Sequence, residues 1–198
     1  MRVILTICLL LLSVSLATAE GPVEGRAGRA EVRFLEGMID HHQLALDMAN
    51  DCLAKASTES VTTLCQMIID AQSSEIEQMR EWLLAWYNIE YRPISMYNPS
   101  DDMGGMDHGD MQMDEPVVDP PMMMGMMAGL DRLEGLDYEI AWLESMIDHH
   151  DDALHMSERV LERAEHEELR TLAENIIAAQ SAEIATMEAM IAELMGEG

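Results

Sequence analysis

The stretch EGMIDHHQLALDM runs from Glu36 to Met48, and a near copy, ESMIDHHDDALHM, runs from Glu144 to Met156. Both contain Met-Ile-Asp-His-His and end on a second methionine. When Phe34 is aligned with Trp142, the two segments match without a gap and stay in register far beyond these stretches. The chain therefore contains an internal repeat, and this repeat decides the fold.

Each copy has a helical pattern with one interruption. Neither contains an interior proline, and in the first copy one apolar stripe recurs at helical spacing, at Ile68, Gln72, Ile76, Met79 and Leu83. The pattern breaks at residues 57–58, where a cap-like Ser-Thr pair precedes an acidic residue, and at residues 165–166 in the second copy. Each copy is therefore predicted to be a helical hairpin.

One hairpin cannot bury its own apolar stripe, whereas two hairpins packed together can. The sequence thus predicts an all-α fold, an antiparallel four-helix bundle made of two repeated helical hairpins. The expected divisions are an N-terminal extension at 20–31, the first hairpin at 32–87, a long Met-rich acidic connector at 88–130 and the second hairpin at 131–198. Five prolines in the connector rule out a continuous helix there.

Residues 1–19 resemble a secretory signal peptide. A basic residue is followed by an apolar run and then by Ala17-Thr18-Ala19. The run is too short for a comfortable membrane span, and no later stretch approaches the roughly 20 apolar residues that a span requires. We expect cleavage after Ala19, no membrane insertion of the mature chain, and a soluble periplasmic or secreted protein.

The charge of the chain limits its partners. Its 38 acidic and 11 basic residues give a formal charge of -27, which repels nucleic-acid phosphates and anionic membrane surfaces. Aromatic residues make up only 4% of the chain, while methionine occurs 20 times. We therefore expect no nucleic-acid partner and a core rich in aliphatic and thioether side chains.

On a helical wheel, Met38, His41 and His42 fall on one face, with Met48 at its far end. Asp40 falls on the opposite side and is expected to be a solvated charge. In the second helix of the hairpin, Met79 is the obvious soft donor. Imidazoles and thioethers form a donor set that prefers Cu(I) or Ag(I) to Mg, Ca or Mn. The alternative for the methionines is simple core packing, because methionine is apolar and flexible.

The connector holds ten of the 20 methionines between Met96 and Met127. Clustered methionines beside a histidine are suited to loose, exchangeable capture of soft cations. The alternative is a disordered acidic linker. The secondary metal candidates are Met103, Met106, His108, Met111 and Met113.

Two cysteines remain after the signal peptide, Cys52 and Cys65, on either side of the predicted turn. A hairpin places them opposite each other, and an exported protein permits a disulfide. Ligation of metal by their thiolates is the alternative. The second copy has Val160 and Ala173 at these positions, so the cysteines are not part of the repeated chemistry.

The pattern Met-Ile-x-His-His-Gln-x-Ala-x-x-Met, followed after the turn by Ile-Ile-x-x-Gln-x-x-Glu-Ile-x-x-Met, resembles the signature of the domain of unknown function 305 family, in two tandem copies. The resemblance implies a ferritin-like bundle and, from the family's best-understood type, an exported protein that binds Cu(I) and Ag(I) through His and Met side chains. The ligands it implies are Met38, His41, His42, Met48, Met79, Met146, His149, His150, Met156 and Met187.

Two other functions compete with copper binding. A ferritin-like iron or di-metal oxidase would use Glu-x-x-His pairs, which do not occur here, although Glu75 and Glu183 could face inward. A Met-rich interaction protein would leave the paired histidines unexplained. We therefore predict an exported copper-binding protein that acts in copper homeostasis or resistance and is not an enzyme. The sequence does not identify the protein that donates metal to it or accepts metal from it.

Overall fold

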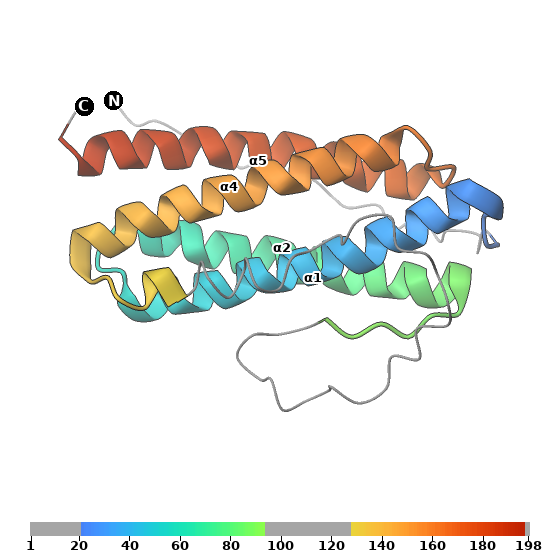
Figure 1. The fold of residues 1–198 in the computed structure, drawn as a ribbon, viewed down its shortest axis with the longest axis horizontal. Coiled ribbons are helices and arrows are strands. Elements are labelled where there is room, and N and C mark those ends of the chain that lie inside the picture. The colour runs from blue at the N-terminus through green and yellow to red at the C-terminus, as the bar shows by residue number, and fades with distance from the viewer. Residues whose placement is uncertain (1–20, 94–127, 197–198) are drawn as a thin grey trace, which may run out of the picture.

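The computed structural model describes residues 21–93 and 128–196 (Figure 1). These residues form two helical pairs and, at 128–130, a short helical turn. The four long helices are α1 (Gly25–Lys55), α2 (Glu59–Tyr87), α4 (Gly135–Leu161) and α5 (Glu167–Leu194).

Several sequence predictions fall on residues outside the described ranges. They are the signal peptide at 1–19 and most of the connector, including all five secondary metal candidates, Met103, Met106, His108, Met111 and Met113. These remain predictions. Helix α1 begins at Gly25, ahead of the boundary expected at residue 32, and α4 begins at Gly135.

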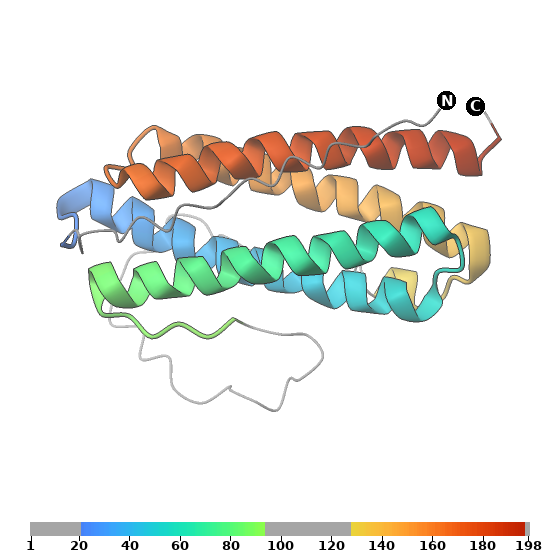
Figure 2. The same ribbon diagram turned by 180° about the vertical axis from the view of Figure 1, so that it is seen from behind.

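The two helices of each pair run antiparallel, and the pairs lie against each other along their length (Figures 1 and 2). The main contact between the hairpins is that of α1 with α4. The described residues contain no strand. The predicted all-α bundle of two hairpins is thereby confirmed. None of the described helices is both long and apolar enough to cross a membrane.

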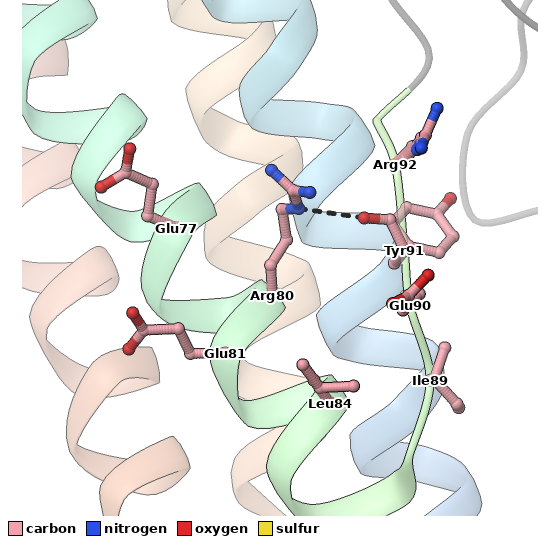
Figure 3. Close-up of a pocket in the computed structure, with 8 residues that line it drawn as sticks. All are labelled: Glu77, Arg80, Glu81, Leu84, Ile89, Glu90, Tyr91 and Arg92. Carbon is pink, nitrogen blue, oxygen red and sulfur yellow. Dashed lines mark hydrogen bonds between the residues drawn. The ribbon is translucent and has the colours of Figure 1, made fainter.

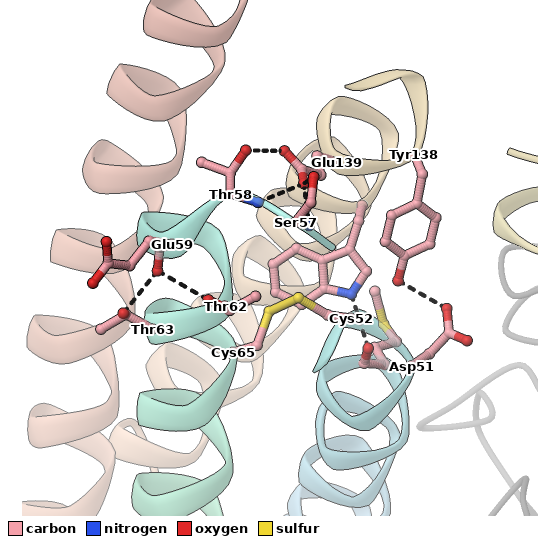
Figure 4. Close-up of a disulfide and its surroundings, with 12 residues drawn as sticks. Asp51, Cys52, Ser57, Thr58, Glu59, Thr62, Thr63, Cys65, Tyr138 and Glu139 are labelled. Atoms are coloured by element: carbon pink, nitrogen blue, oxygen red, sulfur yellow. Dashed lines mark hydrogen bonds between the residues drawn. A yellow bond between two sulfur atoms is a disulfide. The ribbon is translucent and has the colours of Figure 1, made fainter. Parts of the chain in front are cut away.

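The helical breaks fall where the sequence predicts them, but the capping groups come from elsewhere. Thr58 precedes α2, and its side chain makes no cap hydrogen bond within that helix. Instead, the carboxylate of Glu139 on α4 accepts hydrogen bonds from the backbone N–H groups of Ser57 (2.7 Å) and Thr58 (2.9 Å) and from both hydroxyls (Figure 4). A carboxylate at this position satisfies backbone donors that a helix leaves unpaired.

The second hairpin has the same arrangement. Glu31 on α1 accepts hydrogen bonds from the backbone N–H groups of Glu165 (2.6 Å) and His166 (3.0 Å), just before α5. Its other oxygen contacts the ring of His166 and accepts a hydrogen bond from the Tyr87 hydroxyl, each at 2.5 Å. Each hairpin therefore caps the turn of the other.

Cys52 and Cys65 form a disulfide across the turn of the first hairpin, with their Cα atoms 6.4 Å apart (Figure 4). The bond joins the end of α1 to the start of α2. At the matching positions of the second hairpin, Val160 and Ala173 are both buried in the core. An apolar contact therefore takes the place of the disulfide in that hairpin.

The core consists of two apolar clusters, one toward each end of the bundle. The Trp86 cluster includes Phe34, Leu35, Met38, Ile76, Met79, Trp86, Met156 and Ile176. The Trp142 cluster includes Leu44, Met48, Cys52, Cys65, Ile68, Met146, Trp142 and Met187. Both contain residues from the two hairpins, so neither hairpin has a complete core without the other.

Candidate metal centre

A polar layer separates the two clusters. Along α1, Met38 belongs to the Trp86 cluster and Leu44 to the Trp142 cluster, with His41 and His42 between them. Along α2, Gln72 lies in the same way between Ile68 and Ile76. The matching positions on α4 and α5 complete the layer, whose buried members are His41, His42, Gln72, His149, His150 and Gln180.

The four imidazoles form a histidine row across the bundle, in the order His42, His41, His149, His150. The rings of His41 and His149 lie in contact at the centre, tilted by 33° to each other, with their centroids 3.6 Å apart. The centroids of the outer rings lie 6.3 Å from His41 and 6.0 Å from His149, respectively. The histidine-bearing faces of α1 and α4 therefore meet and bring the two histidine pairs together.

A carboxylate stands at each end of the row. Nε2 of His42 lies 2.7 Å from a carboxylate oxygen of Glu75 on α2, and Nε2 of His150 lies 2.7 Å from Glu183 on α5. From the sequence alone, these two glutamates are expected to act only as possible ligands of an iron site. Their role as histidine partners could have been suspected, because both glutamates occupy matching positions in the aligned copies.

The thioethers flank the row in two mixed sets. Met38 and Met79 of the first hairpin share the Trp86 cluster with Met156 of the second. Met146 and Met187 of the second hairpin share the Trp142 cluster with Met48 of the first. All six side chains are buried.

This arrangement differs from a grouping within each hairpin, in which Met48 would stand with Met38, and Met156 with Met146. Ten residues of helix advance the chain by about 15 Å, too far for two thioethers to share one ion. Instead, the indole N–H of Trp142 donates to the backbone carbonyl of Met48, which fixes that residue against the second hairpin. Helices α1 and α4 run in opposite directions. Met48 therefore lies in the cluster of Met146 and Met187, and Met156 lies in the cluster of Met38 and Met79.

Burial keeps the two central imidazoles neutral. Burial, together with the nearby charges that the other three histidines could carry, holds the pKa of His41 well below its usual range. The pKa of His149 is lowered to about 3, first by burial and then by the proximity of His150. A neutral imidazole can ligate a metal without first losing a proton, and a thioether never carries one.

Unpartnered polar atoms are concentrated in the polar layer. Of the ten buried side-chain atoms without a hydrogen-bond partner in the described residues, eight belong to its histidines and glutamines. They include Nδ1 of every histidine in the row and both side-chain polar atoms of Gln72. Buried polar groups are normally satisfied, so such a concentration indicates a place that accepts a ligand or water.

Within the described ranges, no group of three or more His, Cys, Asp or Glu side chains is arranged to hold a metal ion. The donors of the layer are instead imidazoles with thioethers close by: Met38 precedes His41 and His42 by one helical turn, and Met146 precedes His149 and His150 likewise. This set fits a soft monovalent ion such as Cu(I) or Ag(I).

Asp40 differs from its prediction as a solvated charge. The residue is only partly exposed, and it accepts a hydrogen bond of 2.5 Å from the hydroxyl of Tyr91, beyond the end of α2. The backbone carbonyl of Tyr91 accepts a further hydrogen bond of 2.9 Å from Arg80 (Figure 3). The surface pocket drawn there, about 430 Å³ in volume, is lined by Glu77, Arg80, Glu81, Leu84, Ile89, Glu90, Tyr91 and Arg92, none of which belongs to the histidine row.

The fold and the layer define a class of protein: a two-hairpin helical bundle with imidazole and thioether donors inside its core. The chain belongs to the family described as "Domain of unknown function (DUF305)", whose profile matches residues 31–191 in one span across both hairpins. None of the curated proteins matches the chain.

Several solved structures resemble this one. A DUF305 protein from Streptomyces coelicolor is 25% identical, with a TM-score of 0.64 over 83% of this chain and 92% of its own. A DUF305 fragment from Deinococcus radiodurans is 28% identical, with a TM-score of 0.64 over 87% of this chain and 99% of its own. CopM in its Cu(II)-bound form is 28% identical, with a TM-score of 0.61 over 82% of this chain and 96% of its own. CopM has also been solved in Cu(I)-bound and Ag-bound forms.

Proposed function

We propose that this protein is exported and binds Cu(I), and also Ag(I), through buried His and Met side chains, in copper homeostasis or resistance. The observation that supports this proposal best is the polar layer. It holds four histidines whose Nδ1 atoms lack partners, and a buried thioether set flanks it on either side. The likeness to CopM, solved with Cu(I), Cu(II) and Ag, points to the same class of ligand.

In this proposal binding is the activity, and no substrate is turned over. Each hairpin is one copy of a family unit within a ferritin-like bundle, and the two copies supply matching donors. The predicted signal peptide at 1–19 and the disulfide between Cys52 and Cys65 support a periplasmic or secreted location, since disulfides persist in oxidising compartments. The connector methionines gather ions for the bundle, and a separate protein donates or accepts the metal.

An anaerobic Cu(I) titration of the mature protein, against a competing chelator, tests the proposal. We expect tight binding that is lost when His41, His42, His149 and His150 are changed to Ala. The matched control is His155→Ala, because this histidine is 73% exposed and lies outside the row. Circular dichroism of each variant separates lost ligands from lost fold. Unchanged affinity and stoichiometry in the fourfold variant would remove these histidines from the proposal.

An iron or di-metal oxidase is the second candidate, because Glu75 and Glu183 each contact a buried histidine. Carboxylates are ligands for iron, whereas thioethers are poor ones. Aerobic addition of Fe(II), followed by its rate of oxidation with and without protein, separates the two functions. Catalysed oxidation together with weak Cu(I) binding would favour the oxidase.

A further inference from the structure

The contacts at the ends of the histidine row determine where two ring protons lie. A carboxylate accepts hydrogen bonds, so the ring nitrogen that faces it must carry the hydrogen. Nε2 of His42 faces Glu75, and Nε2 of His150 faces Glu183, both at 2.7 Å. In a singly protonated ring, the lone pair is then on Nδ1.

The third ring has the same arrangement. Nε2 of His149 lies 2.9 Å from the backbone carbonyl of His41, which can only accept a hydrogen bond. The lone pair of His149 therefore also falls on Nδ1. Thus three of the four rings use Nε2 as a donor within the protein, and the Nδ1 atoms of all four are buried without a partner.

We propose that Glu75 and Glu183 are positioning residues for the metal: they hold His42 and His150 with the proton on Nε2, so that Nδ1 of each ring is the ligating atom. This inference rests on the proposed function. A carboxylate on the distal nitrogen of a metal-binding histidine fixes the tautomer and ring orientation, and it makes the ligating nitrogen more basic.

The negative charges of the two glutamates also compensate the positive charge of the ion. A monovalent cation held by neutral imidazoles and thioethers would leave an uncompensated charge in an apolar core, which is costly. The Glu75 side chain is 25% exposed and that of Glu183 22%, whereas both histidine side chains are completely buried. Each carboxylate is thus partly exposed to solvent, and it is hydrogen-bonded to a buried histidine of the layer. Its negative charge therefore lies one imidazole ring away from the proposed ion.

The first measurement needs no metal. Long-range ¹H–¹⁵N correlation spectra of the metal-free protein, labelled at its histidine nitrogens, report which ring nitrogen carries the proton. We expect His42 and His150 to be protonated at Nε2. In Glu75→Ala we expect His42 to become a mixture of tautomers while His150, whose glutamate is intact, stays unchanged as an internal reference. Protonation at Nδ1 in the unaltered protein would overturn the proposal.

The second measurement adds Ag(I), which is redox-stable, to the same samples. We expect it to shift the Nδ1 resonances, and we expect the affinity to fall about 10- to 100-fold in the variant with both Glu75→Ala and Glu183→Ala. The matched control changes Glu77 and Glu188, exposed residues of the same two helices, to Ala. It removes the same charge and should keep the affinity within about twofold.

The variants with Glu75→Gln and Glu183→Gln keep a hydrogen-bond acceptor but lose its charge. Their Ag(I) affinity should therefore lie between that of the unaltered protein and that of the Ala variants. They also replace the Ala variants if those fail to fold. Perturbation of Nε2 instead of Nδ1, or full affinity in the double Ala variant, would overturn the positioning role alone. If the unaltered protein binds neither Ag(I) nor Cu(I), the proposed function itself falls, whichever tautomer the metal-free protein shows.

Discussion

Glu31 and Glu139 occupy matching positions in the two hairpins, and each carboxylate caps the turn of the opposite hairpin. Both residues are buried. The pair therefore couples the two hairpins: the start of α2 depends on α4, and the start of α5 depends on α1. A domain built from two similar halves is held in one relative placement by such reciprocal contacts, and the histidine row depends on that placement.

Removal of one cap should destabilise the whole bundle. Glu139→Ala leaves the backbone N–H groups of Ser57 and Thr58 without their acceptor, and we expect a loss of about 2–3 kcal/mol in the free energy of unfolding. Urea denaturation measures this loss. Glu144→Ala, an exposed residue of the same helix, is the control and should change little. A loss no larger than that of the control would show that the turn needs no partner from α4.

The same carboxylate predicts a pH dependence. Burial alone raises the pKa of Glu139, but hydrogen bonds from Thr58 and Ser57 outweigh it and lower the pKa from its ordinary value of 4.5. A group whose pKa is lower in the folded state contributes stability above its unfolded pKa and loses it as the pH falls through the folded pKa. The stability difference between the protein and its Glu139→Gln variant should therefore be full above the ordinary pKa of 4.5 and shrink as the pH falls below it. A difference independent of pH would contradict this account.

The disulfide should stabilise the first hairpin without acting on metal. Cys52 and Cys65 are 13 residues apart, and closing a loop of this size is worth about 3 kcal/mol through restriction of the unfolded chain. Reduction should lower the denaturation midpoint accordingly, while the variant with both cysteines changed to Ala should not respond to reductant. Ag(I) affinity should survive in that variant. A large loss of affinity would instead support the thiolate ligation that the sequence left open.

The fold could be predicted from the sequence because the two copies share the same helical periodicity, the same break between helices and the same buried face. It also places His41 and His42 in the interior, since both fall on the apolar stripe. It could not show the reciprocal contacts, because these depend on how α1 crosses α4 in space. The same applies to Asp40, whose partner Tyr91 lies beyond the end of α2, in a part of the chain that the repeat does not cover.

The exchange of methionines between hairpins gives the most specific test of the candidate site. Suppose that Met38, Met79 and Met156 bind one ion, and that Met146, Met187 and Met48 bind another. The variant with Met38→Leu and Met156→Leu should then lose one of two bound Ag(I) ions and keep the other. The variant Met38→Leu with Met48→Leu should weaken both. Leucine nearly conserves the core volume, so stability should fall by less than about 1.5 kcal/mol per substitution.

Native mass spectrometry during an Ag(I) titration counts the bound ions in each variant directly. Met67→Leu with Met195→Leu is the control, because both side chains are 57% exposed and lie outside the two clusters. If instead the Met38 and Met48 pair removes one ion cleanly and leaves the other at full affinity, each hairpin binds metal with its own methionines. The crossing of α1 and α4 would then serve packing alone.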